Sequence, residues 1–125
     1  MYNQKMISKS LEMAMIFLGK EVTIKIDRPI GSVHPKFDKL IYTSNYGYIE
    51  GTLAPDGEEL DAFILKVSEP VKEFTGIAIA IVHRLTDDDD KLVVVPKGET
   101  MTDEEIEMAI EFQEKWITSK HTIVR

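Results

Sequence analysis

The sequence contains no cysteine. Disulfide bonds, cysteine-based zinc sites and thiol nucleophiles are therefore excluded. This composition is compatible with a reducing compartment, and we expect a cytoplasmic location. Basic residues are also few, with 15 Lys and Arg against 22 Asp and Glu, for a formal net charge of −7. Nucleic acids and anionic membranes are bound by basic faces, so we expect neither as a partner.

Two other features are scarce: long apolar runs and phosphate-binding loops. The apolar stretch at residues 11–18 is short and is interrupted by Glu12, and no small-residue cleavage site follows it. It fits neither a signal peptide nor a membrane span. We expect residues 1–20 to form a short helix or an arm packed on the domain, and its methionines could contribute a homo-oligomeric interface. The chain has no Walker-type loop and no Gly-x-Gly-x-x-Gly motif, so nucleotide binding by those devices is unsupported.

The 125 residues, of which 43% are hydrophobic, fit a single domain spanning residues 1–125 with one core. Residues 22–27 alternate apolar and polar, which predicts a half-buried strand. Nearly continuous apolar runs predict strands buried on both faces, and a short strand is also expected. These segments are 61–67, 77–82 and 92–95, and 40–42 for the short strand.

A helix is predicted near the C-terminus. Thr102 is a candidate N-cap with Glu105 three residues later, the pattern of a capping box. Met101 and Ile106 are placed for a hydrophobic staple, and apolar residues recur at helical spacing as far as Trp116 and Ile117. Several strands followed by one long helix predict an α+β fold, built as a small barrel or curled sheet.

Two acidic clusters are candidates for a cation site. Asp56, Glu58 and Asp61 fall within six residues, and Asp61 directly precedes a buried strand. A carboxylate in that position loses part of its hydration and needs a partner or a metal ion. Oxygen ligands alone suit Mg²⁺ or Mn²⁺. For any one of these acids taken singly, the usual explanation is a turn-former or a solvated strand-end charge.

The second cluster is the run Asp87–Asp90, which Lys91 follows directly. Such a run by itself is typical of a solvated hairpin tip. Between two buried strands, however, four adjacent acids cost stability unless a cation relieves them, and Lys91 offers a point charge for phosphate. Tyr46 and Tyr48 share one face of a strand, either as core aromatics or as hydrogen-bond donors to phosphate. His83 is interpreted as a core histidine with a polar partner.

From Val22 to the C-terminal helix, the chain resembles family I soluble inorganic pyrophosphatases. The family's Asp-Gly-Asp-Pro-Leu-Asp signature is matched at Asp56 and Asp61, with Glu58 in place of the middle aspartate. The other matching blocks are Tyr42-x-x-Asn45-Tyr46-Gly47-Tyr48-Ile49, Gly51-Thr52-Leu53, and Lys91-Leu92-Val93-Val94-Val95-Pro96 preceded by Asp89.

The resemblance implies an OB-fold-like β-barrel, closed or partly open, with a C-terminal helix packed outside. It also implies Mg²⁺-dependent hydrolysis of pyrophosphate to two phosphates, with Mn²⁺ as an alternative metal. The implied metal ligands are Asp56, Asp61, Asp87 and Asp89. The implied catalytic residues are Glu58, which orients or deprotonates the water, Asp56, Tyr46 and Lys91. The implied substrate-binding residues are Lys25, Arg28, Tyr46 and Lys91.

The chain departs from the family pattern where phosphate is gripped. Thr23 and Lys25 stand where the family has a lysine and then a glutamate. A family arginine before the Asn45 block is missing, with His34 or Lys36 nearest to it. The family's Tyr-Lys pair on the last helix appears as Trp116-Ile117, and Lys25, Arg28 and Lys115 are candidates to compensate. Two alternatives therefore stay open: a metal-dependent hydrolase of another small phosphate or phosphoanhydride, and a non-catalytic binding protein of the same fold.

Overall fold

The computed structural model describes residues 9–52, 59–85, 89–116 and 120–125. Within these ranges the chain forms two helices and six strands. The helices are α1 (Lys9–Phe17) and α2 (Asp103–Glu114). The strands are β1 (Glu21–Arg28), β2 (Asn45–Tyr48), β3 (Asp61–Ile64), β4 (Glu73–Arg84), β5 (Lys91–Val95) and β6 (His121–Val124).

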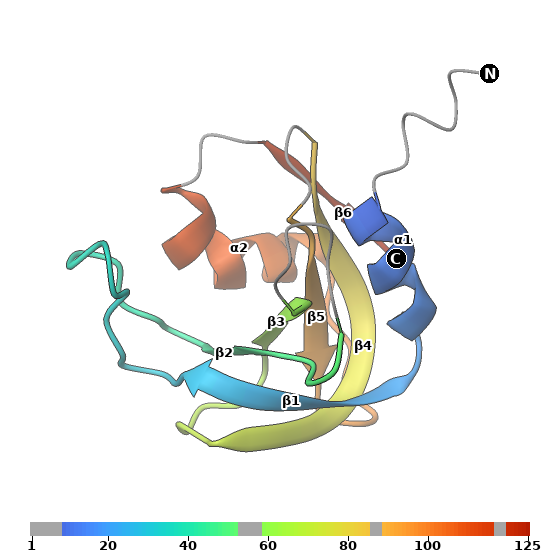
Figure 1. Ribbon diagram of the computed structural model, residues 1–125, viewed down its shortest axis with the longest axis horizontal. Coiled ribbons are helices and arrows are strands. Elements are labelled where there is room, and N and C mark those ends of the chain that lie inside the picture. Colours follow the sequence, from blue (N-terminus) through green and yellow to red (C-terminus); the bar gives the residue numbers. More distant parts are fainter. Residues whose placement is uncertain (1–8, 53–58, 86–88, 117–119) are drawn as a thin grey trace.

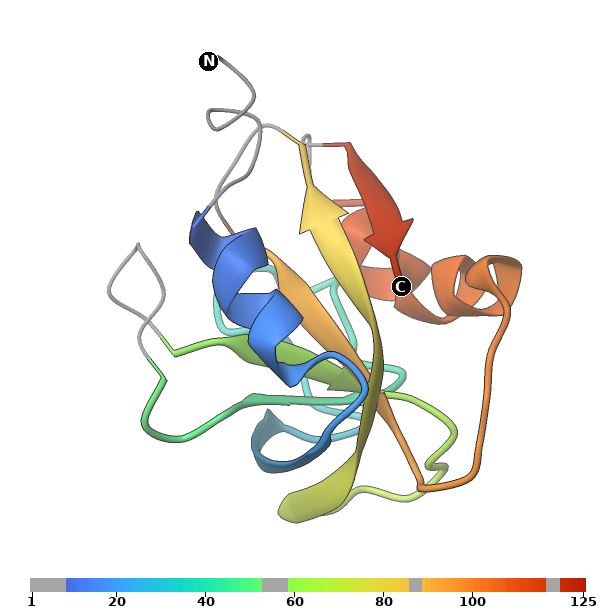
Figure 2. The same ribbon diagram turned by 90° about the vertical axis from the view of Figure 1, so that its right-hand side faces the viewer.

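Five of the strands close into a barrel. The sheet runs β1-β2-β3-β5-β4-β6, and β1 also pairs with β4, which joins the two sides of the sheet. All neighbours are antiparallel except β3 and β5, which are parallel. β6 adds to β4 outside this ring. The helices lie outside the barrel on different sides of it (Figure 1, Figure 2). The expected α+β, OB-fold-like barrel is thereby confirmed, in its closed form.

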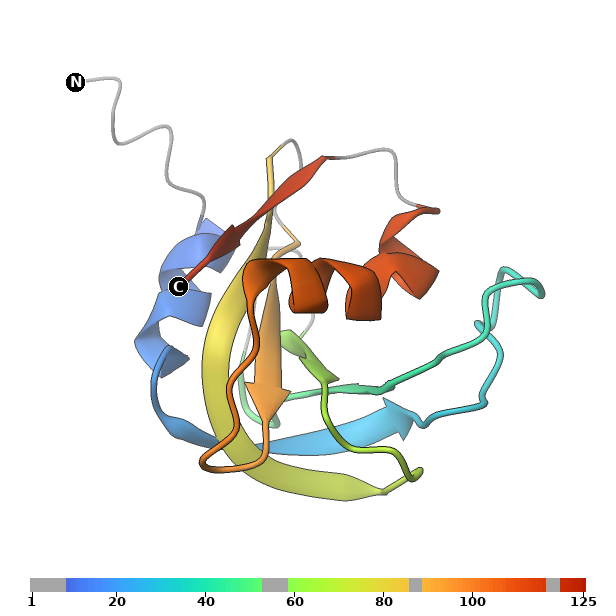
Figure 3. The ribbon, with the colours of Figure 1, turned by 180° about the vertical axis from the view of Figure 1, so that it is seen from behind.

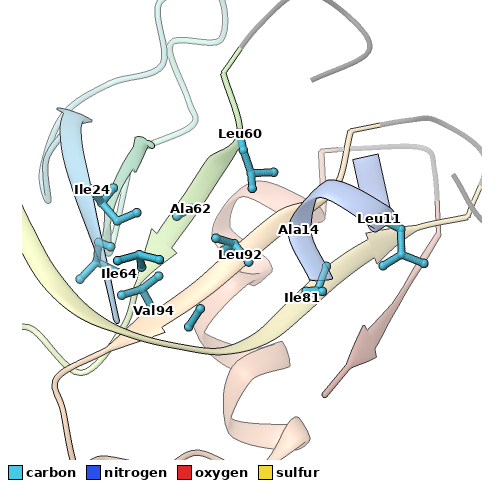
Figure 4. Packing of buried hydrophobic residues seen from close by; sticks show 11 residues of the cluster. Leu11, Ala14, Ile24, Leu60, Ala62, Ile64, Ile81, Leu92 and Val94 are labelled. Carbon is cyan, nitrogen blue, oxygen red and sulfur yellow. The ribbon is translucent and has the colours of Figure 1, made fainter. Parts of the chain in front are cut away.

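The apolar runs place β3 and β5 between two hydrophobic clusters. Alternate residues of these strands, such as Ala62 and Leu92, enter a first cluster with β1, β4 and α1. Figure 4 shows Leu11 and Ala14 of α1 beside this cluster. The intervening residues, such as Phe63 and Val93, enter a second cluster that includes Ile106 and Ile110 of α2. Because both faces are covered, both strands are apolar almost throughout.

Helix α2 begins as the sequence predicts. The Thr102 hydroxyl accepts from the Glu105 backbone N–H at 3.1 Å, and the Glu105 carboxylate accepts from the Thr102 N–H at 2.8 Å. The hydrogen bond from the Thr102 backbone holds the pKa of Glu105 below its usual value. Met101 and Ile106 enter the same cluster, as the staple requires. The cap matters for the site because α2 carries Gln113 and Glu114 to it.

We expect Thr102→Ala to lower the free energy of unfolding by about 1 kcal/mol, since it removes the acceptor for the Glu105 N–H. Urea denaturation followed by circular dichroism would measure the change. Thr100→Ala makes the same chemical change at an exposed position two residues earlier and is expected to stay within about 0.5 kcal/mol of the starting protein. Equal losses in the two variants would contradict the cap.

The structure differs from the sequence-based expectation in four places. The strand expected over residues 61–67 is shorter, because β3 ends at Ile64. Residues 40–42 do not form a strand, and the described chain there has only an isolated bridge between Val33 and Ile41. β6 was not predicted. It pairs with the C-terminal half of β4, and this long-range pairing supports a four-residue strand with a weak local pattern. Helix α2 ends at Glu114, so Trp116 lies beyond it and is 46% exposed. Neither described helix has the length and hydropathy of a membrane span.

Candidate active site: a cleft of paired carboxylates and cations

The parallel pairing of β3 and β5 creates the centre of the site. Asp61 and Lys91 are the first residues of these strands, and the register sets them side by side. Parallel neighbours start at the same edge of a sheet, so the acid and the lysine emerge together there. Asp61 and Lys91 are 30 residues apart in the sequence, and the barrel brings them together with Asp89 of the second acidic cluster.

Around this pair lies a cleft of about 490 Å³. Its lining comes from every barrel strand, from the connection between β1 and β2, and from α2. That connection lies on the same side of the barrel as the C-terminal end of α2 (Figure 3). The charged lining residues are Arg28, Lys36, Arg84, Lys91, Asp27, Asp61 and Asp89, and the others include His34, Phe37, Leu40, Tyr46 and Gln113.

A single ammonium group joins the carboxylates. Lys91 Nζ donates to Asp61 Oδ2 at 3.2 Å and to Asp89 Oδ1 at 2.8 Å. The Lys91 side chain is 3% exposed, whereas those of Asp61 and Asp89 are 31% and 41% exposed. Burial alone lowers the pKa of Lys91, but Tyr46, Asp61 and Asp89 outweigh burial and raise it above its usual value. Lys91 therefore stays charged at neutral pH.

The Tyr46 phenol donates to the same Asp61 oxygen at 2.9 Å. Burial raises the pKa of Tyr46 well above its ordinary value, so the phenol keeps its proton and acts as a donor. The Lys91 ammonium also lies 5.8 Å from the centre of the Tyr46 ring. Among the described residues, both of these hydrogen bonds to Asp61 end on Oδ2, which leaves Oδ1 for another cation.

Arg28 supplies positive charge on the β1 side of the cleft. Its guanidinium donates to the Tyr42 hydroxyl at 2.6 Å and lies 5.6 Å and 5.7 Å from the centres of the Tyr42 and Tyr46 rings. Tyr42 in turn donates to Gln113 of α2 at 2.9 Å. His34 lies nearby, and burial together with the charges of Arg28 and Lys36 lowers the pKa of His34, so its imidazole is neutral near pH 7.

Arg84, the last residue of β4, joins the cleft to α2. Its Nε and Nη2 donate to the two oxygens of Glu114 at 3.3 Å and 2.8 Å, and its Nη1 donates to Asp89 Oδ2 at 3.1 Å. The side chains of Arg84 and Glu114 are 5% and 4% exposed. Asp90, which follows Asp89 in the chain, is buried. Its carboxylate hydrogen-bonds to the His83 imidazole and accepts from the Arg84 backbone N–H. His83 is thus a largely buried histidine with a partner, as the sequence suggests.

The structure brings together five of the metal, catalytic and substrate-binding residues expected from the sequence: Arg28, Tyr46, Asp61, Asp89 and Lys91 all line the cleft. His34 and Lys36, the residues nearest to the missing family arginine, line it as well. Three others, Asp56, Glu58 and Asp87, lie outside the described residues.

Lys25 and Lys115 are not at the cleft, contrary to the expectation that they compensate in binding phosphate. Lys25 pairs at 2.6 Å with Glu73, which is opposite it in the β1–β4 ladder. The Lys115 ammonium lies 5.7 Å from the centre of the Trp116 ring. Asp27 and Arg28 are neighbours in β1, and in a regular strand their side chains would point to opposite faces of the sheet. The pairing of β1 with β2 shifts register between Ile26 and Arg28. This bulge is compatible with both residues lining the cleft.

Sequence reasoning missed Arg84 as a site residue. Arg84 ends an apolar strand, and a buried charge in that position is the signal that could have found it.

The donor atoms present fit a hard metal ion. Within the described part of the chain, no group of three or more histidine or acidic residues is arranged to hold a metal. Asp61 and Asp89 nevertheless converge on one positive charge, the Lys91 ammonium. Carboxylate oxygens of this kind are the ligands that Mg²⁺ prefers. The remaining ligands expected from the sequence, Asp56 and Asp87, are outside the described residues.

The chain is similar to inorganic pyrophosphatases in both sequence and fold. An inorganic pyrophosphatase from Sulfolobus acidocaldarius is 33% identical over 91 residues, which is 66% of this chain and 51% of the relative. One from Streptomyces coelicolor is 36% identical over 80 residues, or 58% of this chain and 44% of the relative. The chain thus spans about half the length of the curated relatives it matches.

Solved structures share the fold. The crystal structure of an inorganic pyrophosphatase from Ehrlichia chaffeensis matches with a TM-score of 0.62 and 18% identity, covering 83% of this chain and 85% of the other. One from Neisseria gonorrhoeae matches with a TM-score of 0.59 and 21% identity, covering 85% and 80%. A family model described as inorganic pyrophosphatase matches residues 15–122. The chain therefore belongs to the inorganic pyrophosphatase family.

Proposed function

We propose that this protein hydrolyses inorganic pyrophosphate to two phosphates with the help of Mg²⁺. The observation that carries the proposal is the meeting of Asp61 and Asp89 on the Lys91 ammonium, in a cleft whose other walls hold Arg28 and Arg84. Carboxylates attract divalent cations, and the fixed cations suit the oxygens of a phosphoanhydride. Membership of the inorganic pyrophosphatase family supports this choice of substrate.

The metal would be held by Asp61 and Asp89, and, on the motif match alone, by Asp56 and Asp87. When bound, Mg²⁺ or Mn²⁺ would lower the pKa of water and neutralise phosphate charge. Lys91 is the partner of both carboxylates in this structure, so it would share them with a bound metal and would remain a charged donor beside the substrate.

The chain's own residues would orient the substrate and the water. Lys91 and Arg28 would donate to phosphate oxygens, and Tyr46, which keeps its proton, would act as a neutral donor. Glu58 and Asp56 are proposed from the motif to orient or deprotonate the attacking water. Such positioning and charge neutralisation supply most of the rate in phosphoryl transfer.

A phosphate-release assay tests the function. We expect the purified protein to release phosphate from pyrophosphate in millimolar Mg²⁺ and to stop when a chelator removes the metal. A folded preparation with no turnover in Mg²⁺, Mn²⁺ or Co²⁺ would contradict the proposal.

The location of Lys25 and Lys115 outside the cleft favours a second candidate, a hydrolase of another small phosphate or phosphoanhydride. Comparable turnover of pyrophosphate and of other substrates in a phosphatase panel would support that alternative.

We further propose that residues 1–125 act as one domain, at a cytoplasmic location, and that α1 contributes to a homo-oligomer. The exposed side chains of Met15 and Ile16 on α1, 50% and 59% accessible, support an interface there. Nucleic acid and membrane are not proposed as partners, because the net charge is −7.

A further inference from the structure

Arg84 is a buried arginine at the cleft that the sequence motifs leave without a role. Its side chain is 5% exposed, yet it is part of the cleft lining. A guanidinium has a planar fork of five N–H donors and keeps its charge at all working pH values. An arginine held in one orientation at a cleft wall is well suited to bind phosphate.

Glu114 fixes that orientation from behind. Its two carboxylate oxygens accept hydrogen bonds from Nε and Nη2 of the Arg84 guanidinium at 3.3 Å and 2.8 Å. Both side chains are almost fully buried, so the pair is shielded from solvent and held by α2. The Nη1 group points the other way, to Asp89 at 3.1 Å, and Asp89 is 41% exposed in the cleft. The arginine thus has one edge bound to the scaffold and one group at the cleft.

Asp89 is the common partner of two cations. Its Oδ1 accepts from Lys91 and its Oδ2 accepts from Arg84. A divalent cation bound by Asp89 would weaken both bonds, since the carboxylate charge would then be shared with the metal. Lys91 and Arg84 would be left as cations at the same wall of the cleft. A phosphate group is the anion that replaces the lost partner.

We propose that Arg84, oriented by Glu114, binds a phosphate group of the substrate. When no metal is bound, the Nη1 group of Arg84 donates to Asp89 instead. The proposal rests on the proposed function, because it names a further contact of the same site. It implies that the metal and the diphosphate bind cooperatively. By linkage, the metal must raise the affinity for the diphosphate by the same factor as the diphosphate raises the affinity for the metal.

The test is binding of methylenediphosphonate, which the protein cannot hydrolyse, measured by calorimetry with and without Mg²⁺. The variant is the pair Arg84→Met with Glu114→Gln, because removing Arg84 alone would leave the buried Glu114 with His121, whose Nδ1 lies 3.5 Å away, as its remaining partner among the described residues. Loss of the guanidinium from that buried pair could prevent folding. We expect methylenediphosphonate in Mg²⁺ to bind this double variant at least about tenfold more weakly than the starting protein. Mg²⁺ alone should bind within about threefold of its original affinity or more tightly, since Asp89 no longer has Arg84 as a partner.

Arg125→Met with Asp103→Asn is the matched control, since Arg125 and Asp103 form an exposed surface pair. It removes one positive and one negative charge, as the double variant does, and is expected to leave diphosphonate affinity unchanged. Glu114→Gln alone retains Arg84 and should show a smaller loss than the double variant. Diphosphonate affinity within twofold of the original in the folded double variant would overturn the proposal, and Arg84 would then only support the structure.

The hydrolysis assay separates this outcome from failure of the function. If the starting protein hydrolyses pyrophosphate while the double variant binds diphosphonate normally, the Arg84 proposal fails and the function stands. If the starting protein binds diphosphonate but hydrolyses nothing, and the double variant binds more weakly, the function fails and the Arg84 contact stands. Absence of diphosphonate binding to the starting protein would overturn both.

Discussion

Asp61→Asn is expected to reduce Mg²⁺-dependent phosphate release from pyrophosphate by at least about 100-fold. Even the outer partners of metal ligands typically change metal affinity or activity by roughly 10- to 100-fold, and Asp61 is placed to be a ligand itself. The substitution also removes half of the negative charge that meets at Lys91, the other half being Asp89. Steady-state rates over a range of Mg²⁺ concentrations would measure the loss.

The fold should survive this change. An asparagine has the same shape, and its amide oxygen can still accept from Tyr46 and Lys91 as Asp61 Oδ2 does. Thermal unfolding should confirm an intact protein, and calorimetry should show weaker Mg²⁺ binding. Asp103→Asn is the matched control, because Asp103 is an exposed residue paired with Arg125 away from the cleft. Retention of more than a tenth of the original rate in Asp61→Asn would contradict the role of Asp61.

Gly47→Ala is expected to cause a large loss of stability, more than about 3 kcal/mol. A Cβ atom at residue 47 would lie 1.8 Å from the carbonyl oxygen of Lys25 and 2.9 Å from the Cα of Ile26. These are backbone atoms of β1, the strand that pairs with β2 and also closes the barrel through β4. Relief of the clash requires β1 and β2 to separate, so the barrel and the position of Tyr46 are both disturbed.

Gly98→Ala provides the comparison. Gly98 has a φ of +92° but open space where a Cβ would be, so its substitution costs only backbone strain of about 1–2 kcal/mol. Urea denaturation of both variants should therefore rank Gly47→Ala as clearly less stable. Equal losses would mean that the barrel tolerates separation of β1 from β2. Gly47 is therefore a point of close backbone approach between β1 and β2.

Much of the fold was predictable because its signals are local. The apolar runs that form β3, β4 and β5 are too long to lie exposed on the surface, so they predict buried strands. The capping box of Thr102 and Glu105 marks the residue at which α2 begins. Strands with weak patterns were not predictable. β6 depends on pairing with β4, and residues 40–42 lack a partner strand long enough to make them a strand themselves.

The candidate site was predictable in part, for the same reason. Asp61, Asp89 and Lys91 belong to compact motifs, so their residue types and spacing suggested the chemistry, and the structure places all three in one cleft. Residue type alone could not show which of Lys25 and Arg84 lies at the cleft, since both are single basic residues in strands. The ladder places Lys25 opposite Glu73 at the surface, and the packing of α2 places Glu114 behind Arg84.

The sequence by itself determined the class of fold, the two acidic clusters, the cap of α2 and the resemblance to the pyrophosphatase family, because each of these depends on residues close together in the chain. Tertiary structure alone decided which charges face one another. The parallel register of β3 and β5 joins Asp61 to Lys91, and Arg84 links Asp89 to α2 across 30 residues. Electrostatic interactions depend on distance and burial in space, and neither quantity can be read from separation along the chain.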